Sequence, residues 1–137
     1  MQVKFTIPMK PTGKGRPRLG GRGAVYTPAK TKAYENFVKG CYWEQCDGYN
    51  FKDKPIILFV KAYMPIPTKF KKAEKEAALR KELIPVEKPD VDNILKAILD
   101  ALNEIAYDDD RYIYRLSIER EYSDNPRTEV SISDEIN

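Results

Sequence analysis

The sequence predicts an α+β domain in which a mixed β-sheet packs against helices. Segments with the two-residue period of strands are interspersed with segments of helical period, in the order strand, helix, strand, helix, helix, strand, strand. The 137 residues contain neither an internal repeat nor a convincing linker. We therefore expect a single domain over residues 1–137.

The N-terminal third predicts a strand, a basic loop and a helix. Residues 2–8 alternate polar and apolar side chains, as in a half-buried strand. Residues 9–25 hold five glycines, two prolines and five basic residues, so we expect a mobile basic loop that takes no part in the core. Thr27, as an N-cap, and Pro28, in the first turn, predict a helix that runs to about Cys46.

The middle of the chain predicts a central strand and two helices of different character. Residues 56–64 are apolar and β-branched, which favours a buried strand. Thr68 is positioned to cap a highly charged, exposed helix over about 69–82. Apolar residues recur every three or four positions over 91–105, which predicts an amphipathic helix of about fifteen residues.

The C-terminal part predicts two strands, because residues 112–122 and 128–133 both alternate in polarity. The turn signal Asp-Asn-Pro at 124–126 lies between them. We therefore expect these two strands to pair as a hairpin.

Composition limits the chemistry that the chain can perform. There is no histidine, and the spacing of Cys41 and Cys46 matches no zinc pattern, so zinc sites and histidine-dependent hydrolysis are excluded. Acid, base or metal chemistry must use carboxylates, lysine, tyrosine or water. No apolar stretch is long enough to span a membrane and no signal peptide is visible, so we expect a cytoplasmic protein.

Charge is unevenly distributed along the chain. The net charge is only +3, but residues 1–32 hold eight basic residues and no acid, while the acids gather from Asp90 onward. This separation suits a protein that binds a polyanion with one region and cations with another. Arg16 and Arg18 are candidates for phosphate contacts on nucleic acid. The alternative is a basic arm that binds nothing in particular.

Two carboxylates stand at the start of the helix predicted over 91–105. Asp90 is positioned as its N-cap, and Asp92 lies in its first turn, where it complements the helix dipole. Their proximity also favours a cation between them. Both interpretations, a simple cap and a divalent metal site, remain open from these two residues.

A second acidic group, Asp108 to Asp110, follows the same helix. It is either a solvated turn or part of the same metal site, and the second option requires the chain to fold back toward Asp90. Carboxylates without histidine or thiolate select magnesium or manganese, ions that support phosphoryl transfer. Lys96, one turn after Asp92, is positioned to steady charge on a phosphate.

The chain resembles the RusA family of Holliday junction resolvases. The matching residues are Lys88-Pro89-Asp90-Val91-Asp92-Asn93 with Lys96, Asp100-Ala101-Leu102-Asn103, Asp109-Asp110, Lys14-Gly15-Arg16-Pro17-Arg18 and Tyr26-Thr27-Pro28. The resemblance covers most of residues 1–34 and 88–120. It implies a RusA-like fold and a magnesium-dependent endonuclease, with manganese as an alternative ion. It further implies a homodimer that nicks two strands of a four-way DNA junction symmetrically, in DNA recombination and repair.

The resemblance also implies roles for particular residues. Carried over, the catalytic group is Asp90, Asp92, Lys96 and Asp110; the metal ligands are Asp90, Asp92, Asp109 and Asp110; and the DNA contacts are Lys14, Arg16, Arg18, Arg22 and Lys88. The chain departs from the pattern at Asp108, a third acid, and at Tyr112, where glutamine is common, so Asp109 and Asp110 can exchange roles. Two other functions remain open: a non-catalytic module that binds branched DNA, and a nuclease that acts on flaps or replication forks.

Overall fold

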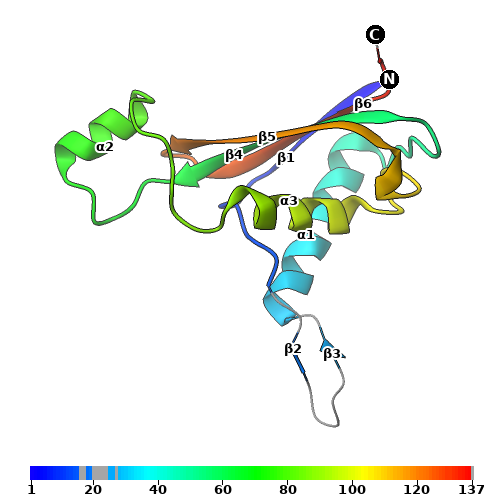
Figure 1. The fold of residues 1–137 in the computed structure, drawn as a ribbon, viewed down its shortest axis with the longest axis horizontal. Helices are drawn as coiled ribbons and strands as arrows, with labels where there is room; N and C mark the ends of the chain where they lie inside the picture. The colour runs from blue at the N-terminus through cyan, green and yellow to red at the C-terminus, as the bar shows by residue number, and fades with distance from the viewer. Residues whose placement is uncertain (16–17, 20–24, 27, 137) are drawn as a thin grey trace.

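A four-stranded mixed sheet forms one layer, and two helices cover one of its faces (Figure 1). The computed structural model describes residues 1–15, 18–19, 25–26 and 28–136. The strands of the sheet lie in the order β1 (Gln2–Ile7), β6 (Arg127–Ser133), β4 (Ile56–Pro65), β5 (Ile113–Ser123). The helices are α1 (Ala29–Cys46) and α3 (Val91–Leu102) across the sheet, and α2 (Lys72–Leu79) near one end of it. The predicted α+β class with a mixed sheet is confirmed.

Strand β4 lies between β5 and β6, so the predicted hairpin is wrong. β4 pairs in parallel with β5, with Leu58 opposite Leu116, and antiparallel with β6, with Val60 opposite Val130. The turn at 124–126 reverses the chain as predicted, but the returning strand passes to the other side of β4. Alternating polarity identifies the strands, and turn residues identify where the chain reverses. Which strands become neighbours depends instead on the burial of β4 in the middle of the sheet.

The core lies between the sheet and helices α1 and α3. Every second side chain of β4 from Ile56 to Met64 is buried, and the side chains between them are half-buried on the other face. Helix α3 presents Ile94, Ile98 and Leu102, each fully buried, on its predicted apolar face. This burial of apolar side chains is the main stabilising contribution to the fold.

The helix ends differ in detail from those predicted. α1 ends at Cys46 as expected, but its N-cap position is held by Pro28 without a side-chain hydrogen bond, and Thr27 lies outside the described residues. α2 begins at Lys72, later than predicted, because the Glu74 carboxylate accepts a hydrogen bond from the backbone N–H of Lys71. α3 has 12 residues, shorter than predicted. The chain leaves it through Glu104, which has a left-handed φ of 68°.

The basic segment after β1 is more structured than predicted. Met9 packs against the core and Pro11 is buried, so residues 9–15 do share in the packing. Farther on, β2 (Arg18–Leu19) and β3 (Val25–Tyr26) pair antiparallel as a separate two-stranded sheet beyond the N-terminal end of α1 (Figure 1). Residues 16–17 and 20–24 lie outside the described part of the chain, so the expected mobility stays a prediction. None of the described helices is both long and apolar enough to cross a membrane.

Register partners in the sheet provide a test of this core. Leu58→Ala removes a fully buried side chain and is expected to lower the free energy of unfolding by about 2–5 kcal/mol. Its partner Leu116, on the edge strand, is 39% exposed, and Leu116→Ala is expected to cost less than about 1 kcal/mol. Urea unfolding of both variants measures the difference, and equal losses would contradict the central position of β4.

Candidate active site

Asp90 caps helix α3. Its backbone is extended, with φ −75° and ψ 168°, and its Oδ1 accepts a hydrogen bond of 3.0 Å from the backbone N–H of Asn93. An aspartate at this position satisfies one of the free N–H groups at the helix start and complements the helix dipole. The cap predicted as one interpretation is therefore present. It uses one carboxylate oxygen and leaves the other available.

Asp92 and Lys96 form an ion pair along the exposed side of α3. Lys96 Nζ lies 3.2 Å from Asp92 Oδ2, and the two side chains are 59% and 70% exposed. A pair of this kind stabilises a helix only slightly, because water screens it. Both groups are thus free to rearrange when a ligand arrives.

The basic segment reaches the start of α3 through a close backbone approach. The backbone N–H of Lys14 donates to the carbonyl oxygen of Asn93 at 3.1 Å. A Cβ on Gly13 would lie 2.8 Å from the Cβ of Pro89, so only glycine fits there without displacement. Gly15 N–H donates to Thr31 Oγ1 at 2.8 Å, which ties the same segment to α1.

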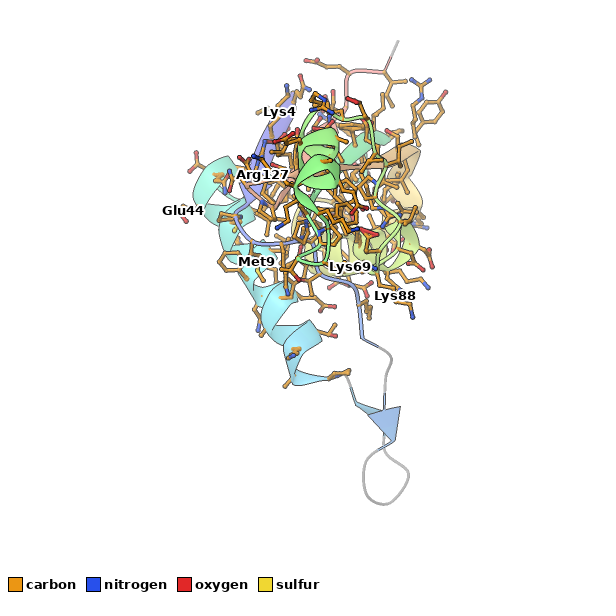
Figure 2. The ribbon with its side chains drawn as sticks, turned by 90° about the vertical axis from the view of Figure 1, so that its left-hand side faces the viewer. Lys4, Met9, Glu44, Lys69, Lys88 and Arg127 are labelled. Atoms are coloured by element: carbon orange, nitrogen blue, oxygen red, sulfur yellow. The ribbon has the colours of Figure 1, made fainter. Side chains whose placement is uncertain are left out.

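Basic and acidic groups share a pocket at this end of α3. Gly13, Lys14, Lys88, Pro89, Asp90 and Asn93 line it. Lys88 is exposed and points away from the body of the protein (Figure 2). An anion in this pocket would lie beside the side chains of Lys88 and Asp90, an arrangement that suits a phosphate group bound next to a cation.

Lys14 makes an ion pair within the protein as well. Its ammonium group contacts Oδ2 of Asp100 and lies 3.9 Å from Oε1 of Glu35. The hydrogen bond with Asp100 raises the pKa of Lys14. Its predicted DNA contact stays a prediction. The side chain of Arg18 and the whole of Arg16 and Arg22 lie outside the described part of the chain.

The second acidic group places its three members differently. Asp108 is exposed. Asp109 is the N-cap of the short 3₁₀ helix Asp110–Tyr112, because its Oδ2 accepts a hydrogen bond of 2.9 Å from the backbone N–H of Arg111. Its side chain is 51% exposed. Asp110 points inward, and its Oδ1 is buried without a hydrogen-bond partner among the described residues. Asp110, more than Asp109, therefore has an oxygen that an added cation would satisfy.

Asp100 and Tyr107 are neighbours of Asp110 that the sequence prediction omitted. Burial raises the pKa of Asp110, the neighbouring Tyr107 hydroxyl lowers it, and the negative charges of Asp100 and Asp109 raise it, with a net rise. Tyr107 is fully buried, and burial together with the charge and hydrogen bonding of Asp110 raises its pKa far above the ordinary value. Asp100 could have been found from its spacing, eight residues after Asp92 and so on the same side of the helix.

The two acidic groups do not converge within one chain. Asp110 returns as far as the neighbourhood of Asp100, near the C-terminal end of α3, while Asp90 and Asp92 stand at its N-terminal end. No group of three or more carboxylate or thiolate side chains in the described residues lies close enough to hold a metal ion. The donors fit a hard ion, but only in the form in which magnesium uses one or two carboxylates, several waters and substrate phosphate oxygens.

The buried carboxylate of Asp110 predicts a dependence of stability on pH. Because folding raises this pKa, the folded state binds more protons than the unfolded state just above pH 3.8, and the free energy of unfolding falls as the pH rises through that window. Asp110→Asn, which carries no charge, is therefore expected to raise the free energy of unfolding at pH 7, with a gain that shrinks as the pH approaches 3.8.

Urea unfolding at several pH values in the presence of a chelator measures this gain. Asp108→Asn changes an exposed neighbour of the same type and is the matched control, expected to change the free energy of unfolding less than Asp110→Asn does because it removes no buried group. A gain at Asp110 that stays constant over the whole pH range would contradict the assignment to this carboxylate.

The comparisons with known proteins match nearly the whole chain. The family model described as Endodeoxyribonuclease RusA matches residues 8–133, from the end of β1 to the end of β6. A relative in Bacillus subtilis (strain 168), the uncharacterized protein YqaN, is 36% identical over 135 residues, which cover 95% of this chain and 94% of the relative. The chain therefore belongs to the RusA family of endodeoxyribonucleases, enzymes that act on Holliday junctions.

Proposed function

We propose that the protein resolves Holliday junctions as a homodimer, by paired symmetric nicks that require magnesium, in DNA recombination and repair. Membership of the family over residues 8–133 supports the substrate and the reaction class. The pocket lined by Lys14, Lys88 and Asp90 carries the assignment of the site, because it offers a phosphate the Lys88 cation beside a carboxylate, with Lys14, now paired with Asp100, close by. The family's enzymatic character disfavours a purely non-catalytic DNA-binding module.

The proposed chemistry divides the residues of the site by charge. The ammonium group of Lys88 attracts the phosphodiester, and Lys14 joins it by leaving Asp100. Lys96 leaves Asp92 to steady negative charge that builds on the phosphate. The free oxygen of Asp90, together with Asp92, Asp109 and Asp110, provides the candidate ligands for magnesium, and manganese prefers the same donors. Bound there, the ion would polarise the phosphate and lower the pKa of a coordinated water.

A homodimer follows from the product that we propose. Two nicks placed symmetrically across a four-way junction need two active sites related by a two-fold axis, and a two-fold dimer supplies them. Because the described residues of one chain do not bring three carboxylates together, the remaining ligands would come from water, from DNA phosphate or from the second copy. Light scattering should give twice the chain mass of 15.8 kDa.

The reaction is tested on a synthetic four-way junction with magnesium. We expect paired nicks at symmetric positions on two opposing strands, and no cleavage when the metal is chelated. Flap and replication-fork substrates of the same sequence are the comparison. Preferential cutting of flaps or forks would replace the junction as the substrate, and cleavage in excess chelator would refute the metal requirement.

Asp90→Asn separates catalysis from folding and from binding. Asparagine caps helices as well as aspartate does, so the fold and the hydrogen bond to Asn93 should be retained. We expect cleavage to be lost while junction affinity stays within about two-fold, because phosphate contacts from basic residues dominate affinity. Electrophoretic mobility shift and cleavage assays on the same preparation measure both. Loss of junction binding by a folded variant would refute this division of labour.

The basic segment is tested by the salt dependence of binding. Each phosphate contact contributes about −0.9 to the slope of log Kobs against log salt on duplex DNA. Arg16→Gln with Arg18→Gln is therefore expected to make the slope shallower by about 1.8, with cleavage at saturating junction unchanged. Lys39→Gln, a single substitution of a basic residue in the interior of α1, is the control. An unchanged slope would remove both arginines from the DNA interface.

A further inference from the structure

One arginine of the sheet holds the irregular segment that leads into the candidate site. Arg120 of β5 donates from Nη1 to the carbonyl oxygen of Glu87 at 2.7 Å and to that of Pro89 at 3.2 Å. Its Nη2 donates to the carbonyl oxygen of Pro85 at 3.0 Å. Three backbone carbonyls just before Asp90 are thus bound by a single guanidinium group.

Residues 83–89 have few other attachments. Pro85 is buried, but Ile84 and Val86 on either side of it are 79% and 81% exposed, so apolar packing holds little of the segment. Among the described residues, no backbone–backbone hydrogen bond involves residues 83–89. In the described part of the chain, the segment is also held by Tyr122, whose hydroxyl donates to the Glu87 carboxylate and interacts with the Val86 backbone.

The chemistry of the guanidinium explains why arginine suits this position. The prolines in the segment have no N–H, so its backbone offers carbonyl acceptors and lacks donors at these positions. Arginine presents five N–H donors in a planar fork and stays charged, whereas lysine carries its three donors on one nitrogen and cannot span three separate carbonyls as a planar fork does. Arg120 and Tyr122 lie on the same side of β5, and that strand pairs with the central β4, with Arg120 opposite Ala62. The segment is thereby fixed to the rigid part of the fold.

We propose that Arg120 is a positioning residue of the endonuclease, which sets the place of Lys88 and Asp90 by holding the backbone carbonyls on either side of Lys88. This proposal rests on the proposed function of Lys88 and Asp90. The helix fixes Asp90 only on its C-terminal side, through Asn93, and Arg120 fixes it on the other side, through Pro89. Displacement of catalytic groups by about 1 Å can lower a rate by about 100-fold.

Arg120→Met keeps much of the side chain's length and removes all three hydrogen bonds. We expect the cleavage rate at saturating junction to fall about 10- to 100-fold, the range typical of residues that orient metal ligands. The magnesium concentration for half-maximal rate should rise, while junction affinity measured without metal stays within about two-fold. Hydrogen–deuterium exchange, which needs no substrate, should become faster in peptides that cover residues 83–92.

Arg127→Met is the matched control, because Arg127 is also a partly buried arginine of the sheet. It bonds the carbonyl oxygen of Asn125 at 2.9 Å and stacks on the Tyr63 ring, away from the 83–89 segment. We expect comparable or smaller loss of stability without a change in the magnesium dependence or in exchange at 83–92. Arg120→Lys, which can restore part of the hydrogen bonding, should give an intermediate rate and an intermediate magnesium midpoint.

The outcomes distinguish this proposal from the proposed function. Unchanged exchange at 83–92 in Arg120→Met, or an unchanged cleavage rate and magnesium midpoint, would overturn the positioning role. If wild-type protein does not cut the junction, the proposed function fails, and exchange at 83–92 still reports whether Arg120 holds the segment. If Arg120→Met does not fold, Tyr122→Phe, which removes only the bond to Glu87, should show faster exchange around residue 87 and a smaller loss of rate. No effect of Tyr122→Phe would count against the proposal.

Discussion

The parallel pairing of β4 with β5 is the constraint on which the rest of the fold depends. A chain that leaves β4 at Pro65 must return to the opposite end of the sheet before it can enter β5 at Ile113. The crossover that makes this return contains α2, α3 and every candidate carboxylate. Because β5 then runs back along α3, its first residues lie near the C-terminal end of that helix, and Arg120 lies near its N-terminal end.

The same geometry explains how much of the protein the sequence could predict. Strand β1, helix α1, strand β4 and the cap at Asp90 follow from local periodicity and capping residues, and the structure has them where expected. The predicted hairpin was wrong because nothing in residues 112–133 indicates that β4 would lie between the two strands of this segment. The role of Arg120 was invisible for a similar reason, since its carbonyl partners lie 31 to 35 residues away and are backbone atoms.

The sequence indicates the composition of a candidate site better than its geometry. The absence of histidine, the Asp90 to Lys96 spacing and the basic N-terminal segment predict which kinds of groups such a site would use. Their distances depend on the length of α3, which at 12 residues and about 1.5 Å per residue separates its two ends by about 18 Å. The close approach of Gly13 to Pro89, which brings Lys14 to the same end of the helix as Asp90, depends on tertiary packing and has no counterpart in local sequence pattern.

Four carboxylates around α3 each have their own partner within the protein. Asp90 and Asp109 accept hydrogen bonds from the backbone N–H groups of Asn93 and Arg111. Asp92 forms an ion pair with Lys96, and Asp100 forms one with Lys14 from another part of the chain. Of the four predicted metal ligands, Asp110 alone among the described residues has a buried oxygen without a well-formed hydrogen bond, although the Tyr107 hydroxyl is its neighbour. An unpaired buried carboxylate oxygen is costly, and a cation from solution would relieve that cost more than it would at the exposed acids. Among these carboxylates, a bound metal ion would therefore stabilise Asp110 most, whereas the groups that would bind the phosphate lie around Asp90.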